Sequence, residues 1–343
     1  MSDDTSLADN IVALPFMTPT RAASAPALGR YGHLLGGSVP MQEVYRRIGK
    51  VAPTMATVLV TGESGSGKEL VARTIHDRSD CANLPFVAVN CGAIPGNLIE
   101  AELFGYEKGS FTGAARTHRG CFERAEGGTL FLDEVTEMAT EMQVRLLRVL
   151  ETGRYTRVGG EHELRAKVRI IAATNRDPRQ AVLEGQLRED LMYRLAVFPI
   201  GLPSLREREG DAELLAEHFL QALNELDATG KAFSRRSMAT IRSYAWPGNV
   251  RELKNAVHRA FIMADDVVEL DFAGLACAEP AGECLRVPIG APLAEIERQV
   301  IYATLDRCEG NKRRCAVMLG ISLKTLYNRL AEYQSAPAAL ATM

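Results

Sequence analysis

Four apolar runs in the central part of the chain predict strands that are buried on both faces. They are short, rich in β-branched residues and separated by helical stretches, and they read TVLVT (57–61), FVAVN (86–90), TLFLDE (129–134) and VRIIAAT (168–174). Near-continuous apolar strands are typical of a parallel sheet covered by helices. We therefore expect residues 31–206 to form an α/β domain around such a sheet.

The pattern becomes purely helical from about Arg206 onward. Apolar residues recur at helical spacing in DAELLAEHFLQALNEL, SRRSMATIRSYAW and NVRELKNAVHRAFIMA, which predicts a small all-α block over 207–266. A segment bearing Gly and Pro, 267–291, is interpreted as a linker, and 292–343 is helical again. The first 30 residues are rich in Ala, Pro, Ser and Thr and are expected to be a disordered tail.

The composition is that of an ordinary globular protein, with 46% hydrophobic and 24% charged residues. The formal net charge of −3 means that any contact with DNA has to come from a local basic patch. Seven cysteines without a CxxC pair or zinc-ligand spacing indicate reduced thiols in a cytoplasm. No apolar run approaches the roughly 20 residues of a membrane span, and the N-terminus lacks the features of a signal peptide. We expect a cytoplasmic protein without a membrane partner.

The stretch GESGSGKE matches the G-x-x-x-x-G-K pattern of a phosphate-binding loop. It follows a predicted strand and opens a predicted helix, so backbone N–H groups and the helix N-terminus can surround phosphate oxygens. The alternative is a chance match in a Gly-rich turn. Glu69 stands where Ser or Thr is usual, so a carboxylate would have to hold Mg²⁺ there, directly or through water. The predicted nucleotide-binding residues are Gly62, Glu63, Ser64, Gly65, Ser66, Gly67, Lys68 and Glu69.

Two acidic residues at the end of the third apolar run strengthen this interpretation. Asp133 and Glu134 follow a buried strand, at the end where α/β sheets bind ligands. Asp133 can hold Mg²⁺, and Glu134 can polarise a water for attack on the γ-phosphate. Alone, the pair could simply cap the next helix. Together with the phosphate-binding loop it indicates a nucleoside triphosphatase.

Further polar residues suit the same site. Thr174 and Asn175 lie just beyond the next strand, within plausible reach of the γ-phosphate. Arg188 and Arg194 are six residues apart on a predicted helix, and an arginine supplied across a subunit boundary can stabilise transition-state charge. The alternative is two surface arginines paired with neighbouring acids. Arg251 lies in the first turn of a predicted helix, where a cation opposes the helix dipole unless a phosphate is bound.

The segment GYEKGSFTGAARTHRG, 105–120, has neither helical nor strand periodicity and is predicted to be a loop. It places an aromatic side chain, Phe111, beside a hydroxyl, Thr112, between two glycines. A large apolar side chain on such a loop needs a partner, and nothing local in the sequence supplies one.

The C-terminal segment NKRRCAVMLGISLKTLYNRLAEY has two short helical patterns joined at LGIS. This is the helix-turn-helix pattern, with 322–333 as recognition helix and Ser322 as its N-cap. A small shared core is expected from Ala316, Leu319, Ile321, Leu326 and Leu330. The predicted DNA-binding residues are Arg313, Arg314, Ser322, Lys324, Thr325, Asn328 and Arg329, on a basic face that also includes Lys312 and meets no acid before Glu332. A basic, solvated helical hairpin is the alternative.

With these residues in hand, the chain resembles the NtrC-like AAA+ activators of sigma-54 RNA polymerase, the bacterial enhancer-binding proteins. The resemblance covers roughly 32–264 and the C-terminal helix-turn-helix. The motifs GESGSGKE, VNCGAI, ELFGYEKGSFTGA, GGTLFLDE, IIAATN, LREDLMYRL, LPSLRER and WPGNVRELKNA occur in the family's order. The resemblance implies an α/β AAA+ subdomain (31–206) with a helical lid (207–266), a Fis-like DNA-binding domain, and a ring, usually a hexamer, with ATP between subunits and a dimer as a possible resting state.

The resemblance also implies roles for individual residues. Lys68 would be the Walker A lysine, and Asp133 and Glu134 would be Walker B, with Asn90 restraining the glutamate. Thr174 and Asn175 match sensor I, Arg251 matches sensor II, and Arg188 with Arg194 match the trans-acting arginines. The family's GAFTGA loop, which contacts sigma-54, is matched by Gly109, Ser110, Phe111, Thr112, Gly113 and Ala114, with Ser110 in place of an alanine.

The largest departure from the family is at the N-terminus, where no receiver or GAF input domain is recognised. Members of that shape resemble the phage-shock and Hrp-type activators, which are controlled by partner proteins or by expression level. A shortened piece of a longer activator is an equally open alternative. Two other functions are open: an AAA+ motor acting on another client, and a DNA-binding regulator that does not act on sigma-54. The first would leave the helix-turn-helix unexplained, and relatives of the second kind lose the loop residues that this chain keeps.

Overall fold

The computed structural model describes residues 29–111, 114–270, 290, 292–308 and 310–335, and the chain divides into two compact units, Met1–Asp271 and Phe272–Met343. The predicted disordered tail lies outside the described residues except at its end, where Arg30 already belongs to a strand. Most of the predicted linker, 271–289, also lies outside them. In the described part of the chain, no helix is long and apolar enough to cross a membrane.

The first unit is built on a five-stranded sheet in which all neighbouring strands are parallel. Its order is β4 (Phe86–Asn90), β5 (Thr129–Asp133), β8 (Arg169–Thr174), β3 (Val58–Thr61) and β9 (Phe198–Gly201). The four apolar runs therefore form the strands that the sequence predicts, and the α/β fold is confirmed.

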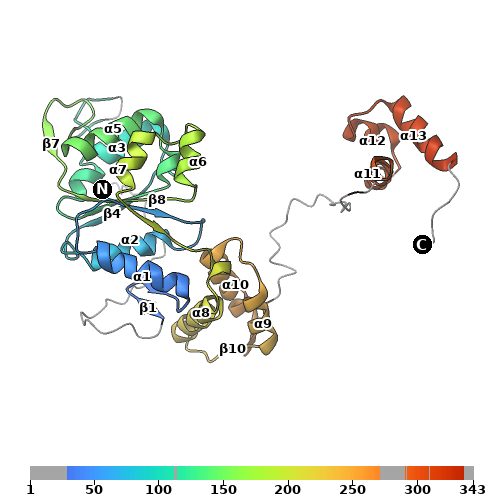
Figure 1. Cartoon of the computed structure of the whole chain (residues 1–343), viewed down its shortest axis with the longest axis horizontal. Coiled ribbons are helices and arrows are strands. Elements are labelled where there is room, and N and C mark those ends of the chain that lie inside the picture. Colours follow the sequence, from blue (N-terminus) through green and yellow to red (C-terminus); the bar gives the residue numbers. More distant parts are fainter. Residues whose placement is uncertain (1–28, 112–113, 271–289, 291, 309, 336–343) are drawn as a thin grey trace, which may run out of the picture. The chain divides into compact units, whose positions relative to one another are not determined.

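Helices cover both faces of this sheet (Figure 1). One face packs on α1 (Val39–Val51) and α2 (Lys68–Asp77); the other packs on α3 (Gly96–Phe104), α4 (Cys121–Arg124), α5 (Thr140–Thr152), α6 (Pro178–Leu183) and α7 (Glu189–Leu195). Alternate residues of one strand go to opposite cores: Leu130 and Leu132 join the second, and Phe131 joins the first. This alternation explains why the strands are apolar at every position.

Several short strands escape the sequence pattern. The edge strand β9 contains Pro199, and the two-stranded sheets β1–β2 (Arg30–Tyr31, Leu34–Leu35) and β6–β7 (Arg154–Thr156, Glu163–Arg165) have two or three residues per strand. Proline is tolerated on an edge strand because one side of that strand needs no ladder hydrogen bond. Segments this short carry no readable period of two.

The helical lid follows as α8 (Asp211–Asp227), α9 (Arg235–Ser243) and α10 (Asn249–Met263). The prediction that strands stop at about Arg206 is wrong in one detail, because β10 (Ala232–Phe233) pairs in parallel with β11 (Val267–Val268). The β11 residues fall within the predicted linker, yet Val268 is fully buried. The lid therefore extends beyond its last helix.

A buried ion pair joins the start of the lid to the N-terminal segment. Asp211 Oδ2 accepts from Arg208 Nε at 3.0 Å, and both side chains are almost completely buried. The carboxylate also accepts from the backbone N–H of Gly37 at 2.6 Å, and from the N–H and hydroxyl of Ser38 at 3.0 and 2.8 Å. These bonds satisfy a buried charge that would otherwise be costly.

We expect Asp211→Ala to lower the free energy of unfolding by about 3 kcal/mol or more, because it leaves the buried Arg208 guanidinium without its counter-ion. Thermal or urea unfolding measures this loss. Glu213→Ala is the matched control: it breaks the pair with Arg242, a largely exposed arginine, and should cost below about 1 kcal/mol. Equal losses in the two variants would contradict the structural role of Asp211.

The second unit is a three-helix domain of α11 (Leu293–Arg307), α12 (Lys312–Met318) and α13 (Leu323–Ser335). Its core contains the five predicted residues: Ala316, Leu326 and Leu330 are buried, and Leu319 and Ile321 pack against them. The predicted cap is present, because Ser322 Oγ accepts from the Thr325 N–H at 3.1 Å.

Candidate functional site

The predicted chemical residues gather at the carboxyl end of the sheet. The loop 62–67 follows β3, Asn90 ends β4, Asp133 ends β5 and Thr174 ends β8. Because these strands are parallel and adjacent in the order β4-β5-β8-β3, their ends lie side by side along one edge. This is the edge at which open α/β sheets bind ligands.

Lys68 lies at the centre of this arrangement. It is the first residue of α2 and is only 8% exposed, and its Nζ donates to the carbonyl oxygens of Gly62 at 2.8 Å and Glu63 at 3.2 Å. Burial lowers the pKa of Lys68, and the charges of Asp133 and Glu134 oppose that shift. The first N–H groups of a helix have no partner within the helix. A buried cation at the start of a helix thus lies within electrostatic reach of two carboxylates, which suits a phosphate carried with a divalent cation.

Glu134 has a strained backbone. Its φ and ψ are 53° and 46°, in the left-handed region that favours glycine, and its N–H donates to Asp133 Oδ1 at 3.0 Å. A Cβ built on Gly92 would lie 2.7 Å from Glu134 Oε2, so the carboxylate touches the turn after β4. Asn90 shapes that turn, because its Oδ1 accepts from the N–H groups of Gly92 and Ala93 at 2.9 and 3.0 Å.

Asn90 and Glu134 are thus brought together, as the resemblance implies. In the described residues, however, the amide of Asn90 bonds to its own turn and not to the carboxylate.

Thr174 and Asn175 have different environments. Thr174 is fully buried, and its hydroxyl is 3.0 Å from that of Thr136, so the structure does not support direct reach of Thr174 to a phosphate. Asn175 is exposed, just beyond the end of β8. The sequence does not reveal this difference, because Thr174 and Asn175 are both polar and only the packing of the sheet decides which of the two is buried.

Arg251 and Glu69 flank the phosphate loop. Arg251 lies in the first turn of α10, and its guanidinium donates to Ser64 Oγ at 2.9 Å, so the lid reaches the loop. Glu69 pairs with Arg73 one turn along α2 at 2.9 Å.

The two predicted trans-acting arginines lie away from this loop. Arg188 is the N-cap residue of α7 rather than a helical residue, and it pairs with Asp190 at 2.7 Å. Arg194 lies inside α7 and donates to the carbonyl oxygen of Leu150, near the end of α5, at 2.9 Å. Both are exposed, and in the described residues neither bonds to the loop 62–69.

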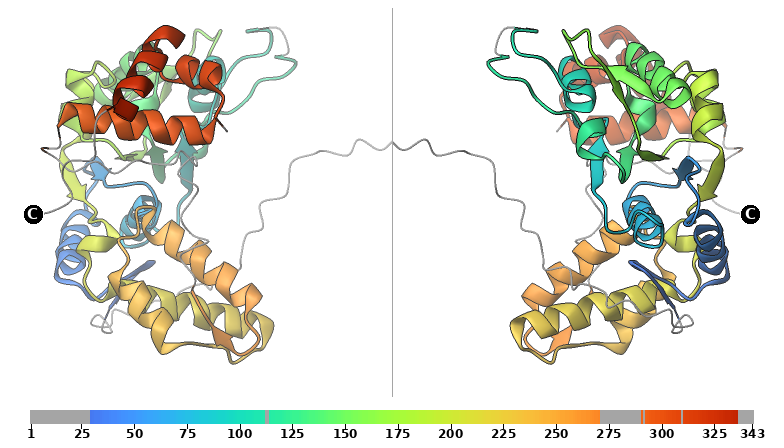
Figure 2. Two further views of the ribbon diagram at one scale, coloured as in Figure 1. Left: turned by 90° about the vertical axis from the view of Figure 1, so that its right-hand side faces the viewer. Right: turned by 90° about the vertical axis from the view of Figure 1, so that its left-hand side faces the viewer.

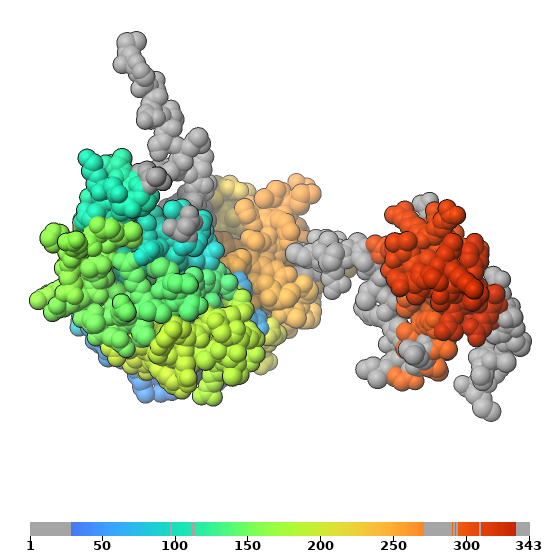
Figure 3. Space-filling model, turned by 90° about the horizontal axis from the view of Figure 1, so that it is seen from above, coloured from blue at the N-terminus to red at the C-terminus, as the bar shows by residue number. Residues whose placement is uncertain are grey.

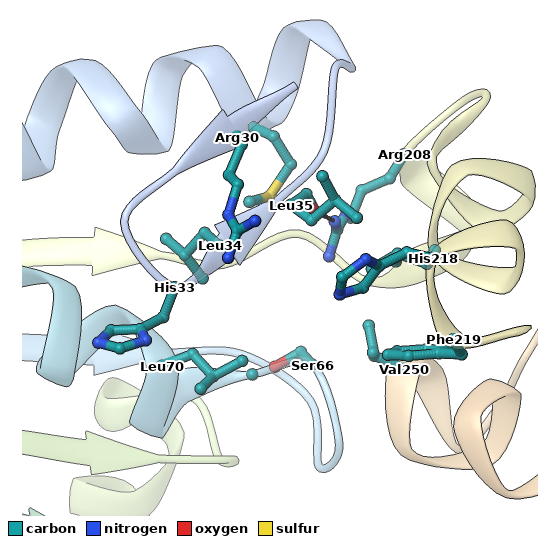
Figure 4. A pocket seen from close by; sticks show the side chains of 13 residues that line it. Arg30, His33, Leu34, Leu35, Ser66, Leu70, Arg208, His218, Phe219 and Val250 are labelled. Atoms are coloured by element: carbon teal, nitrogen blue, oxygen red, sulfur yellow. Dashed lines mark hydrogen bonds between the residues drawn. The ribbon is translucent and has the colours of Figure 1, made fainter. Parts of the chain in front are cut away.

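A pocket of about 260 Å³ adjoins the phosphate loop, and the sequence did not reveal it. Its walls come from the β1–β2 hairpin with Arg30 and Leu35, the phosphate loop and α2 with Ser66 and Leu70, and the lid with His218, Phe219 and Val250, as Figure 4 shows. Met41 of α1 also lines it. Burial lowers the pKa of His218, and the nearby charge of Arg30 acts in the same direction. The imidazole is therefore biased toward its neutral form. In that form one ring nitrogen can donate a hydrogen bond and the other can accept one, beside the aromatic and aliphatic groups of the pocket.

Residues 105–111 and 114–120 project from the first unit (Figure 2) and form a raised part of its surface (Figure 3). Phe111 is 42% exposed, and its ring meets that of Tyr106 edge-on at 4.9 Å between centroids. Tyr106 stacks on His118 at 5.2 Å, and the two exchange backbone hydrogen bonds across the loop. Among the described residues, the ring of Phe111 thus packs on Tyr106 and stays partly exposed. The predicted contacts Thr112 and Gly113 lie outside the described residues.

Ser110 anchors the loop to the turn between β6 and β7. Gly159 has φ +71°, and a Cβ built there would lie 2.6 Å from Ser110 Cβ, so only glycine allows this approach. The Ser110 hydroxyl is buried and has no hydrogen-bond partner among the residues that the structure describes. Gly109 and Ala114 close the loop's base through a 2.9 Å hydrogen bond between their backbones.

The second unit presents most of the predicted DNA-binding side chains to solvent. Arg313, Arg314, Ser322, Lys324, Thr325 and Asn328 are exposed. Arg329 differs, because Glu297 of α11 pairs with it at 3.1 Å and Glu332 at 3.3 Å. The expectation of a face without acids before Glu332 is therefore wrong: tertiary packing brings Glu297 from another helix.

The comparisons with known families cover both units. A family described as "Sigma-54 interaction domain" matches residues 34–201, an "AAA+ ATPase lid domain" matches 206–275, and "Bacterial regulatory protein, Fis family" matches 292–333.

Individual proteins match across these domains. The chain is 44% identical over 331 residues to the DNA-binding transcriptional regulator NtrC of Azospirillum brasilense, covering 87% of this chain and 69% of that protein. It is 43% identical over 321 residues to the regulatory protein AtoC of Escherichia coli (strain K12), covering 90% of this chain and 69% of AtoC. Among solved structures, NtrX from Brucella abortus in complex with ATP aligns with a TM-score of 0.66 at 37% identity, covering 88% of this chain and 69% of NtrX.

Proposed function

Because the chain belongs to the NtrC-like, sigma-54-dependent transcriptional activators, we propose that its first unit hydrolyses ATP at the carboxyl edge of the sheet and uses the 105–120 loop to remodel the polymerase. The sigma-54 interaction domain, the AAA+ lid domain and the Fis-type DNA-binding domain belong to this one chain. The observation that carries the proposal is the position of Lys68, buried at the start of α2 within the electrostatic reach of Asp133 and Glu134.

The chemistry follows from where charge develops. In phosphoryl transfer, negative charge spreads over the transferred group, and catalysis consists of positioning and electrostatic stabilisation. Lys68 and the N–H groups at the start of α2 are placed to stabilise that charge. Glu134 is the candidate to orient the attacking water, and its strained backbone holds the carboxylate beyond the end of β5. Asn175 is the exposed polar group at the end of the neighbouring strand β8.

Asp133 would hold Mg²⁺ together with the phosphates. Magnesium in such sites keeps several waters and takes one or two carboxylates plus phosphate oxygens, and it would neutralise charge on the transferred group. Glu69, in the first turn of α2, is the second carboxylate that could take part, once its ion pair with Arg73 opens.

The pocket between the hairpin, the loop and the lid suits the nucleoside. Its walls combine apolar groups such as Leu35 and Phe219 with the neutral-biased His218, and it begins at Ser66 of the phosphate loop. NtrX structures are described in complex with ADP and with ATP. A nucleotide with its phosphates at Lys68 would extend from the loop into this pocket.

A ring of subunits would complete the site. Arg188 and Arg194 are exposed and do not bond to their own phosphate loop, which suits action on a neighbouring subunit's nucleotide. The ring size, the resting oligomer and any regulatory protein partner belong to this proposal, and so does the enhancer as the DNA target.

The proposal is tested by reconstitution. The purified chain should hydrolyse ATP and convert a closed complex of sigma-54 polymerase into an open complex on a promoter with an upstream binding site, detected by permanganate footprinting. The matched control is polymerase with the housekeeping sigma factor on its own promoter, which the chain should not affect. ATP hydrolysis without open complexes would favour a motor with another client; DNA binding without hydrolysis would favour a simple regulator.

Arg313→Ala should weaken DNA binding and reduce its salt dependence. Removing one phosphate contact reduces the magnitude of the negative slope of log K against log [salt] by about 0.9. Arg329→Ala is the matched control, because Glu297 and Glu332 already neutralise that side chain. Fluorescence anisotropy across a salt series measures both slopes. A larger change for Arg329→Ala than for Arg313→Ala would place the basic surface elsewhere.

A further inference from the structure

Asn249, the first residue of α10, is a buried polar residue to which the ATP site gives no chemical role. It is 0% exposed, and its φ of 54° lies in the left-handed region, which asparagine tolerates better than most side chains. A buried amide is costly unless its donor and acceptor are both satisfied. The hydrogen-bond partners of this amide therefore indicate the role of Asn249.

The amide of Asn249 connects three segments that are far apart in sequence. Its Oδ1 accepts from the N–H of Leu205 at 2.8 Å, in the short helix η2 (Leu205–Glu207) that leads from the sheet to the lid. Its Nδ2 donates to Glu63 Oε2 at 3.0 Å and to the carbonyl oxygen of Ser64 at 3.1 Å. One side chain of the lid thus holds both the phosphate loop and the connection between the two subdomains.

Glu63 is the charged member of this contact. Arg206 of η2 donates to both of its carboxylate oxygens, at 3.0 and 2.5 Å. The hydrogen bonds from Arg206 and Asn249 hold the pKa of Glu63 below its ordinary value, so the carboxylate stays ionised. The bond from Asn249 is therefore charge-assisted, the stronger class of hydrogen bond.

The backbones of the phosphate loop and of the lid are in direct contact at Gly65 and Gly248. Gly65 has φ +76°, and a Cβ there would lie 2.4 Å from the carbonyl oxygen of Gly248, so only glycine fits. The N–H of Arg251 donates to the carbonyl oxygen of Gly65 at 3.2 Å. A shift of the turn 246–249 would therefore displace the phosphate loop.

We propose that Asn249 and Glu63 are positioning residues that make the shape of the phosphate loop depend on the placement of the lid. The lid also supplies His218 and Phe219 to the pocket. A nucleotide that contacts these lid residues therefore also fixes the conformation of the phosphate loop that surrounds its phosphates. The contact governs nucleotide affinity more than the rate of the chemical step. This inference rests on the proposed ATPase function.

Asn249→Asp tests the contact with an almost isosteric change. The carboxylate still accepts from Leu205, but it cannot donate and it places a negative charge against Glu63. We expect the KM for ATP and the Kd for N-methylanthraniloyl-ADP to rise about tenfold, the effect of losing one buried hydrogen bond to a charged group, with a smaller change in kcat. In the double variant Glu63→Gln with Asn249→Asp, the glutamine amide can donate to the aspartate carboxylate, so the hydrogen bond returns with donor and acceptor exchanged. It should recover most of the lost affinity.

A matched control separates positioning from stability. Asn224 of α8 also makes three side-chain hydrogen bonds inside the lid, two to the backbone of Lys231 and one to the hydroxyl of Thr229. Asn224→Ala should lower the Tm but leave KM unchanged. Glu63→Ala, at a partly exposed position, is a second variant that should fold and should also raise KM.

Three outcomes would overturn the inference: an unchanged KM in Asn249→Asp, an unchanged KM in Glu63→Ala, or no recovery in a folded double variant. They are distinguishable from failure of the proposed function, which would show as absence of ATP hydrolysis in the wild-type chain.

Discussion

Phe111→Ala abolishes open-complex formation and leaves ATP hydrolysis largely unchanged: this is the first result we expect. The ring is 42% exposed on a projecting loop and touches Tyr106 with one edge, so its removal takes away an outward contact without disturbing the core. None of its described contacts is with Lys68, Asp133 or Glu134. ATP turnover and permanganate reactivity of the promoter, measured on the same protein preparation, give the two readouts.

Met55→Ala is the control for the loop. Met55 is also exposed and apolar, but it precedes β3, at the end of the sheet opposite the phosphate loop. It should leave both hydrolysis and open complexes unchanged. If Phe111→Ala still formed open complexes at the wild-type level, the loop would not be the element that acts on sigma-54.

Arg194→Ala should lose ATP turnover by about a thousandfold, the lower range for removal of a transition-state arginine supplied in trans, while ADP still binds. The physical reason is that the guanidinium is exposed and bonds to one neutral backbone carbonyl, that of Leu150 near the end of α5, so a neighbouring subunit's phosphates can replace that neutral partner. Steady-state hydrolysis and N-methylanthraniloyl-ADP binding measure the two effects. Arg179→Ala, another exposed arginine on α6, is the matched control and should retain turnover.

Mixing two inactive variants tests whether Arg194 acts across a subunit boundary. In an equal mixture of Arg194→Ala and Glu134→Gln chains, about a quarter of the interfaces in a closed ring combine an intact Glu134 with an intact Arg194. Activity should therefore return on mixing. A mixture that stays inactive although the two chains co-assemble would assign Arg194 to its own subunit, and normal turnover of Arg194→Ala alone would remove it from the site.

Short sequence motifs were sufficient to predict the residues that would bind the phosphates and the metal ion. The glycines and lysine of 62–68 and the acids after β5 can be predicted because short-range rules constrain them: a phosphate loop needs glycines, and strand ends in a parallel sheet share one edge. The recognition helix with its Ser322 cap was also predictable, because capping and helical spacing act within a few residues.

Other features could not be predicted from the sequence, because they arise from contacts between residues that are distant along the chain. The pocket combines residues near 30–35, 66–70 and 208–219, and no spacing rule relates those segments. Thr174 and Asn175 are neighbours in sequence, yet one is sealed in the core and the other is exposed. The charge of Arg329 is offset by Glu297, more than 30 positions earlier in the chain.

The sequence by itself therefore determined the class of fold, the phosphate loop, the acids beside it and the basic helix-turn-helix, because each depends on periodicity or on interactions between near neighbours. Only the tertiary structure decided that Phe111 rests on Tyr106 and keeps an open face, that Ser110 packs on Gly159, and that Asn249 ties the lid to Glu63. Such contacts depend on how helices and loops from distant parts of the chain pack, and packing is decided by shape and hydrogen-bond satisfaction across the whole domain.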